Sequence, residues 1–351
     1  MDISVIDKNL AVDKTIDKTG LVFYNIDSEP FRIYGVFREG ENYWRLPSEI
    51  ARGTSQGVYG LASNTAGGRI RFVTNSKRVA LIAKYSSIYH APHMPLTGAA
   101  GFDVYVGKRY YATFVPPVSF SNKAYESVMS FQTAESRVIT VNMPLYSSPT
   151  AVWIGVDEGA VIECAPDYTY EKPVVYYGSS ITQGGCASHA GMSYQGIISR
   201  KLDTNFVNLG FSGNGKAEPI MAEYIAGLDM SCFVYDYDHN APNPEYLAET
   251  HERMFLTIRE KNPDLPIIMI SRPDYHGSEA DDKRFAVIKQ TYDNAVARGD
   301  KNVYIIHGKT FYADSEEGLE PSVDTCHPTD YGFKLMAEVI APYVAKAIGA
   351  E

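Results

Sequence analysis

Two loops in the second half of the chain carry side chains that could together perform acyl transfer. Ser180 lies in the run Gly178-Ser179-Ser180-Ile181, and His327 ends the run Asp324-Thr325-Cys326-His327. A serine hydroxyl attacks a carbonyl group efficiently only if a base accepts its proton, and histidine does this near neutral pH. Asp324 can reach the other nitrogen of the same ring and fix its tautomer. We therefore predict Ser180, Asp324 and His327 as catalytic residues.

Acyl transfer also needs donors for the negatively charged oxygen of the tetrahedral intermediate. The backbone N–H groups of Ser180 and Gly213 and the side-chain amide of Asn240 are the predicted oxyanion-hole donors. Ser179 stays an alternative nucleophile because it adjoins Ser180. Cys326 could also act as a nucleophile, but nothing near it in the sequence indicates a thiol of lowered pKa.

Other residues close to these loops could contact a substrate. His239 precedes Asn240, and Arg272 follows a predicted strand, although a structural role is as plausible for each. In the first half, residues 88–101 form a long loop that contains His93 and Met94. We expect this loop to reach over the neighbouring domain and line a cleft, and the alternative is an ordered surface loop.

Histidines are also metal ligands, and His90 and His93 have His-x-x-His spacing. No third ligand of suitable spacing accompanies them. We therefore predict no metal and no cofactor.

The catalytic candidates follow short apolar runs that alternate with amphipathic segments after Pro173. Such alternation predicts an open parallel sheet with helices on both faces. Loops at the carboxyl ends of its strands share one edge, where ligands bind. The predicted strands are 173–177, 206–209, 232–235, 266–270 and 303–306, and the predicted helices lie near 190–203, 217–226, 244–261, 280–298 and 329–348.

The first half shows short alternating runs and little helical periodicity, which predicts a β-sandwich, most simply a jelly roll. Its strand candidates are 21–24, 69–73, 79–83, 102–106, 110–114, 138–141 and 152–156. We accordingly divide the chain into a sandwich domain at 1–165 and a catalytic domain at 166–351.

The composition of the chain indicates which classes of binding partner to expect. A net charge of −10 over 351 residues argues against a nucleic-acid surface. The 26 tyrosines offer flat apolar faces with polar tips, which suit sugar rings. We find no run of transmembrane length and expect no membrane partner. A homo-oligomer is left open.

The compartment is predicted from the cysteines and the first residues. The four cysteines form no CxxC pair, which favours free thiols in a reducing compartment. The first residues lack the pattern of a secretory signal. We therefore expect a cytoplasmic protein.

At this point the chain resembles a known family, the SGNH or GDSL hydrolases. Their four blocks contribute Ser, Gly, Asn and His in the order found here, at Ser180, Gly213, Asn240 and His327. There are two departures. Ser179 stands where the family usually has Asp, and Ala241 stands where an Asp usually follows the Asn. The second departure leaves open what orients the amide of Asn240.

The first half adds to this resemblance. Residues 101–105, Gly-Phe-Asp-Val-Tyr, look like the signature of a β-sandwich that precedes SGNH domains in some bacterial carbohydrate esterases. The resemblance implies a flavodoxin-like α/β/α domain that follows a jelly-roll β-sandwich along the chain, and an esterase acting on acetylated hemicellulose. Manno-oligosaccharides are favoured over xylo-oligosaccharides. The alternatives are a lipase or thioesterase acting on a non-sugar ester, and a carbohydrate-binding protein without catalysis.

Overall fold

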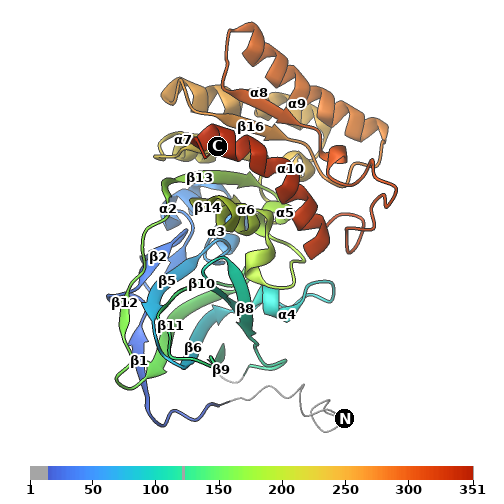
Figure 1. Ribbon diagram of the computed structural model, residues 1–351. Helices are drawn as coiled ribbons and strands as arrows, with labels where there is room; N and C mark the ends of the chain where they lie inside the picture. Colours follow the sequence, from blue (N-terminus) through green and yellow to red (C-terminus); the bar gives the residue numbers. More distant parts are fainter. Residues whose placement is uncertain (1–14, 121–122, 351) are drawn as a thin grey trace.

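Five parallel strands form the centre of the second half in the computed structural model, which describes residues 15–120 and 123–350. Their order across the sheet is β14-β13-β15-β16-β17, the flavodoxin-like order (Figure 1). The strands are apolar because helices cover both faces, and every residue of β15 and β16 is buried. Their bounds are β13 (Tyr170–Gly178), β14 (Thr204–Gly210), β15 (Cys232–Asp236), β16 (Ile267–Ile270) and β17 (Val303–Ile306).

Alternate residues of this sheet enter two separate cores, as a period of two requires. Val175 and Tyr177 pack under α7 (Pro219–Ala226), α8 (Pro244–Lys261) and α9 (Glu279–Ala297). Val174 and Tyr176 pack under α6 (Tyr194–Leu202) and α10 (Asp330–Ile348). The predicted three-layer α/β/α architecture is confirmed.

The first half is a sandwich of two antiparallel sheets around one apolar core, as predicted. One sheet has the order β1-β11-β6-β9, with β1 (Leu21–Asn25), β11 (Ser148–Asp157), β6 (Arg78–Ser87) and β9 (Ala124–Ser130). The other runs β12-β5-β10-β7-β8, and β2 (Arg32–Tyr34) also pairs with β5. Its strands are β12 (Ile162–Cys164), β5 (Arg69–Thr74), β10 (Arg137–Asn142), β7 (Phe102–Val106) and β8 (Arg109–Phe114).

The stretch between β2 and β5 departs from the sequence prediction, because it contains two helices, α2 (Ser48–Thr54) and α3 (Gln56–Ala62). They follow a hairpin of β3 (Phe37–Glu39) and β4 (Asn42–Trp44). These helices pack on the second half, where Trp44 and Ala51 share a core with Met221 of α7.

Glycines permit that close approach. A Cβ on Gly53 would lie 2.6 Å from Ile220, and one on Gly57 would lie 1.9 Å from the side chain of Asn214. Arg45 is buried in the same contact and donates to the carbonyls of Asn208 (3.1 Å) and Gly210 (2.6 Å) of β14. The first half thus supplies part of the core of the second.

A short stretch between β12 and β13 joins the halves. Within residues 15–120 and 123–350, no helix combines the length and apolar character needed to span a membrane.

Candidate active site

The turn after β13 presents two serines in different ways. Ser179 is the N-cap of the short helix α5 (Ser180–Gln183), and its hydroxyl accepts from the N–H of Ile181 (3.2 Å). Serine caps a helix as well as aspartate does, so the departure from the family pattern at Ser179 leaves the cap intact. Gly178 is required before it, because a Cβ there would lie 1.8 Å from Asp236 Oδ1. Ser180 begins the helix and is only 5% exposed.

The structure brings Ser180, His327 and Asp324 together. Nε2 of His327 lies 2.9 Å from the Ser180 hydroxyl, and Nδ1 lies 2.9 Å from Asp324 Oδ2. Asp324 Oδ1 also accepts from the N–H groups of Cys326 (3.1 Å) and His327 (2.7 Å). Partial burial opposes ionisation of Asp324, but the hydrogen bonds from His327 outweigh it and lower the pKa of the carboxyl. A carboxylate therefore faces the imidazole at neutral pH.

The three predicted oxyanion-hole donors, Ser180, Gly213 and Asn240, follow the ends of β13, β14 and β15. Among the described residues, nothing accepts from the N–H groups of Ser180 and Gly213. Gly213 has a φ of 69°, which favours glycine, and a Cβ there would enter open space. Asn240 Oδ1 accepts from the N–H of Gly215 (3.1 Å), which leaves the NH₂ end of the amide as the free donor. The N–H of Gly215 thus orients the amide of Asn240, a role that the replacement of the usual Asp by Ala241 had left open.

The loop that carries Asn240 is held from behind by Arg284 of α9. Its guanidinium donates to the carbonyls of Asp238 and Ala241. The carbonyls on both sides of Asn240 are therefore fixed to a long helix rather than left in a free loop.

Two residues that sequence reasoning missed connect the sandwich to the nucleophile. Gln183 donates to Asn64 (3.2 Å) and Leu145 (3.1 Å) of the first half, and its Oε1 accepts from the N–H of Ser212 (3.0 Å). Tyr146 donates to the carbonyl of Ser180 (3.2 Å). No local sequence pattern marks either residue, because their partners lie far away in the chain.

The loop between β6 and β7 lies against the second half. The ring centroids of His93 and His327 are 5.6 Å apart. Thr97, in the short helix α4 (Leu96–Ala99), donates to the carbonyl of Ser188 (2.5 Å). Met94, which was expected to touch substrate, is 7% exposed and packs in the core, so that expectation has no support.

His239 and Arg272 are used internally. The Nε2 atom of His239 lies 3.1 Å from Cys326 Sγ, and burial lowers the pKa of the imidazole to about 4. Arg272 donates to both oxygens of Asp274 (2.9 and 2.5 Å) and to Asp281 (3.0 Å). With each guanidinium nitrogen engaged, a substrate contact for Arg272 has no support in this geometry.

Cys326 is a thiol rather than a thiolate. Burial first, and then the charge of Asp274, raise its pKa to about 12. This disfavours the alternative in which Cys326 is the nucleophile.

Three groups of metal-ligating atoms occur among the described residues, each within 4.8 Å. Two of them use His327, which already bonds Ser180 and Asp324. The third joins His239, Asp274 and Cys326, where Arg272 already occupies both oxygens of Asp274. The expectation of no metal stays a prediction.

A buried carboxyl lies directly behind the nucleophile turn. Asp236 ends β15 and accepts hydrogen bonds from Thr182 and from Tyr194 (3.2 Å). Burial raises its pKa to about 8, so that Asp236 is mostly protonated at neutral pH.

Each half of the chain matches a family model. Residues 171–345 match the model of the GDSL-like lipase/acylhydrolase family. Residues 21–162 match the model for the N-terminus of SGNH-hydrolase-type esterases. No curated protein sequence matches the chain significantly.

Several solved structures share the whole two-part architecture. A protein described as a GDSL-like lipase from Bacteroides ovatus is 28% identical, with a TM-score of 0.82 over 94% of this chain and 98% of the other. A salicylyl-acyltransferase from a tetracycline biosynthetic pathway is 19% identical, with a TM-score of 0.76 over 93% and 97%. An acetyl xylan esterase from Butyrivibrio proteoclasticus is 12% identical, with a TM-score of 0.59 over 94% and 99%.

Proposed function

The chain belongs, through residues 171–345, to the GDSL-like lipase/acylhydrolase family and is a carboxylic ester hydrolase, and we propose that it removes O-acetyl groups from carbohydrate. The proposed substrates are acetylated hemicellulose oligosaccharides, manno-oligosaccharides first and xylo-oligosaccharides next. The observation that carries the reaction type is the chain of two 2.9 Å contacts from Ser180 through His327 to Asp324.

In the proposed first step, His327 Nε2 takes the proton of Ser180 while the serine oxygen attacks the acetyl carbonyl. Asp324 stabilises the imidazolium that forms. The oxyanion accepts from the N–H groups of Ser180 and Gly213 and from the Asn240 amide. Collapse of this intermediate breaks the ester bond, and His327 gives its proton to the departing sugar oxygen, which leaves as a hydroxyl.

Acetyl-Ser180 is then hydrolysed by the same residues in reverse roles. His327 removes a proton from water, the hydroxide attacks the acetyl carbonyl, and a second tetrahedral intermediate collapses. Acetate leaves as Ser180 regains its proton from His327. The balance is one water consumed for each ester cleaved.

Two features support a sugar as the alcohol part. The loop with His93 comes from the sandwich and lies beside His327, where it could form one wall of a cleft. The folds of several carbohydrate esterases match this chain, among them a family two enzyme from Clostridium thermocellum solved with cellohexaose, with a TM-score of 0.58 and 16% identity. These proteins share the fold, and the substrate is proposed on the loop and the fold together.

The decisive experiment is mass spectrometry of acetylated manno- and xylo-oligosaccharides before and after incubation with the protein. We expect losses of acetyl groups, faster on the manno series, and none with Ser180→Ala. If the protein hydrolyses 4-nitrophenyl acetate but deacetylates neither series, the carbohydrate substrate is contradicted and the esterase activity still holds. Turnover of simple thioesters in that case would favour a thioesterase.

A further inference from the structure

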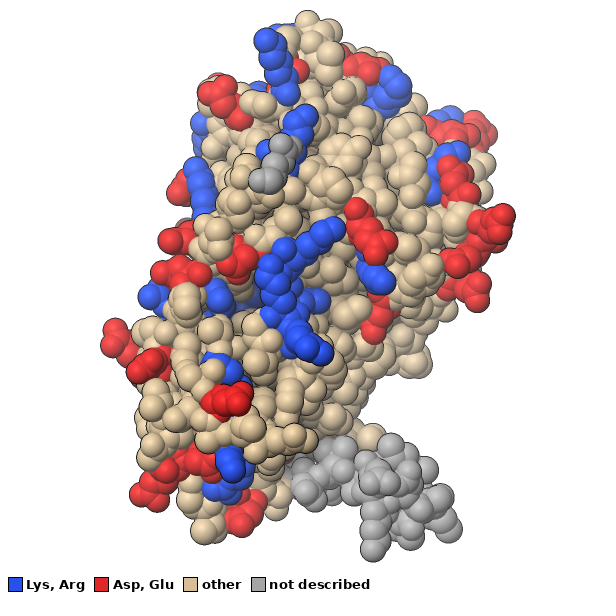
Figure 2. Space-filling view, viewed as in Figure 1, with Lys and Arg blue, Asp and Glu red and all other residues tan. Residues whose placement is uncertain are grey.

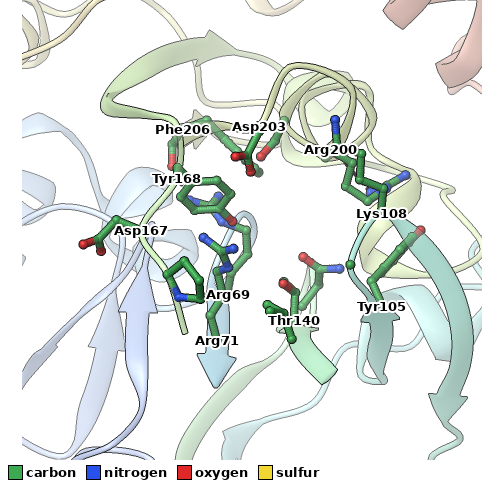
Figure 3. Close-up of a pocket in the computed structure, with 16 residues that line it drawn as sticks. Arg69, Arg71, Tyr105, Lys108, Thr140, Asp167, Tyr168, Arg200, Asp203 and Phe206 are labelled. Atoms are coloured by element: carbon green, nitrogen blue, oxygen red, sulfur yellow. Dashed lines mark hydrogen bonds between the residues drawn. The ribbon is translucent and has the colours of Figure 1, made fainter. Parts of the chain in front are cut away.

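A cavity lies between the two halves, away from Ser180. It has a volume of about 290 Å³ and opens where β5, β10 and β7 face α6 and the start of β14 (Figure 3). Phe206 marks its position near the amino end of β14, whereas Ser180 follows the carboxyl end of β13. Its polar lining includes Arg69, Arg71, Lys108, Asp167, Arg200 and Asp203.

The strand periodicity explains why basic residues gather here. On β5, Ile70 and Phe72 point into the sandwich core, so Arg69 and Arg71 point to the opposite face. Thr140, the partner of Arg71 on β10, lies on that face too. Figure 2 shows basic side chains gathered near the middle of this side of the molecule, although the chain carries a net charge of −10.

Arg71 is the unusual member of the lining. It is 7% exposed, and no described residue bonds to its Nε or Nη1 atom. Its guanidinium carbon lies 4.1 Å from the centre of the Tyr168 ring. Arg69 differs, because its Nη1 and Nη2 atoms donate to Gly67 (2.8 Å), Asn205 (2.6 Å) and Phe206 (3.0 Å), and only its Nε atom has no partner among the described residues. A buried cation without a counterion is strongly unfavourable, so an anion is the expected partner of Arg71.

The other charged side chains of the cavity do not neutralise Arg71 and add further positive charge for such an anion. Lys108 and Arg200 lie across the gap from Arg69 and Arg71 in Figure 3, and all four line the same cavity. Asp167 already accepts from Arg32 (2.5 Å) and Tyr34 (2.7 Å), which are not part of the lining.

Asp203 is also engaged, because it accepts from the backbone N–H and the hydroxyl of Thr169 (3.1 and 2.6 Å). Four basic against two acidic side chains therefore leave an excess of two positive charges.

We propose that this cavity binds a phosphate group, either free or as the monoester of a small molecule. A phosphate dianion matches the excess charge and offers oxygens to the donors of Arg71 that have no other partner. The faces of Tyr168 and Phe206 would pack against the rest of a monoester. The bound group would join the sandwich to α6, because Arg71 and Arg200 come from opposite halves.

The test measures binding of inorganic phosphate to the full chain by calorimetry in a phosphate-free buffer of low ionic strength. Wild type should bind, and saturating phosphate should raise the Tm by about 3 °C or more. Arg71→Met should reduce affinity at least tenfold, yet be as stable as wild type without phosphate, because it removes an unpaired buried charge. Arg109→Gln removes an exposed charge from β8 and is the matched control, with wild-type binding expected.

Lys108→Ala provides a second variant on an exposed turn, and we expect severalfold weaker binding. A hexose 6-phosphate that binds more tightly than inorganic phosphate would identify a monoester as the ligand, and equal affinity would identify the free ion. The proposal is overturned if wild type fails to bind 10 mM phosphate, if Arg71→Met and Lys108→Ala both bind as wild type does, or if glucuronate, a carboxylate, binds better than either phosphate.

Discussion

The contact between Ser180 and His327 distinguishes two adjacent serines that the sequence leaves as rivals. Ser180→Ala should lower kcat by at least about 10³-fold, because the hydroxyl that lies 2.9 Å from Nε2 of His327 is lost. Ser179→Ala should cost about 1 kcal/mol of stability through the lost helix cap and change kcat far less. Steady-state kinetics and denaturation of both variants check this. A larger loss of kcat in the Ser179 variant would identify Ser179 as the nucleophile.

Asn240 should act on the transition state rather than on the bound substrate. Asn240→Ala is expected to lower kcat about 10²-fold with little change in KM. Asn240→Asp should be at least as damaging, since it keeps the oxygen that accepts from Gly215 but loses the NH₂ donor. If either variant changed KM alone, the amide would bind substrate instead of the oxyanion.

Asp236 should make stability depend on pH. With its folded-state pKa raised from 3.8 to about 8, the folded protein keeps a proton that the unfolded chain releases between about pH 4 and pH 8. The free energy of unfolding should therefore fall as pH rises, by up to about 1.4 kcal/mol per pH unit from this group. Asp236→Asn lacks this contribution, so its stability relative to wild type should increase from pH 5 to pH 8.

Urea denaturation at several pH values measures that difference. Asp229→Asn is the control, because the side chain of Asp229 is 86% exposed. A constant difference between wild type and Asp236→Asn across the range would show that Asp236 is ionised in the folded state.

Residue types and spacing predicted that Ser180, His327 and Asp324 meet, because each block of the family is only a few residues long and can be identified locally. They did not predict how the donors are oriented. The Asn240 amide is set by Gly215 and its loop by Arg284, contacts made only once separate βα units are packed together. Gln183 was invisible for the same reason, since it bonds Asn64, 119 residues earlier.

Among the elements, the loop between β6 and β7 is the one whose role can be separated from the chemistry. If it forms a wall for the sugar, His93→Ala should reduce deacetylation of oligosaccharides at least tenfold more than hydrolysis of 4-nitrophenyl acetate, about 1.4 kcal/mol of transition-state binding. His90→Ala, in the same loop, is the control, because the His90 ring packs beside Phe120. Equal losses of activity on both substrates would show instead that His93 supports the catalytic function of His327 and does not bind the sugar.

Helices and strands with clear periodicity were predicted within a few residues. The helix at 244–261 has its predicted bounds, because Asn243 caps it and accepts from the N–H of Tyr246 (2.8 Å). α2 and α3 were missed because Gly53, Gly57 and Gly60 weaken their helical pattern. Packing on the second half stabilises those helices, and such long-range contacts cannot be predicted from the local sequence.

For the molecule as a whole, the two halves should not separate cleanly. The fragment 166–351 would lack Trp44, Leu46 and Arg45, which fill or line one core of the parallel sheet. We expect this fragment to be insoluble, or to bind hydrophobic dyes and lack sharp tertiary signals in near-UV circular dichroism. A soluble fragment with cooperative unfolding and wild-type esterase activity would show that the sandwich is dispensable.

The packing of α2 against α7 also has a consequence for synthesis on the ribosome. α2 ends at Thr54, and α7 begins at Pro219. At usual elongation rates, the partner of α2 emerges about ten to thirty seconds after α2 itself. During that interval Trp44 and Leu46 have no core to enter, although neighbouring strands of the sandwich can already pair. The nascent chain therefore carries an apolar segment that a chaperone could bind until the parallel sheet is complete.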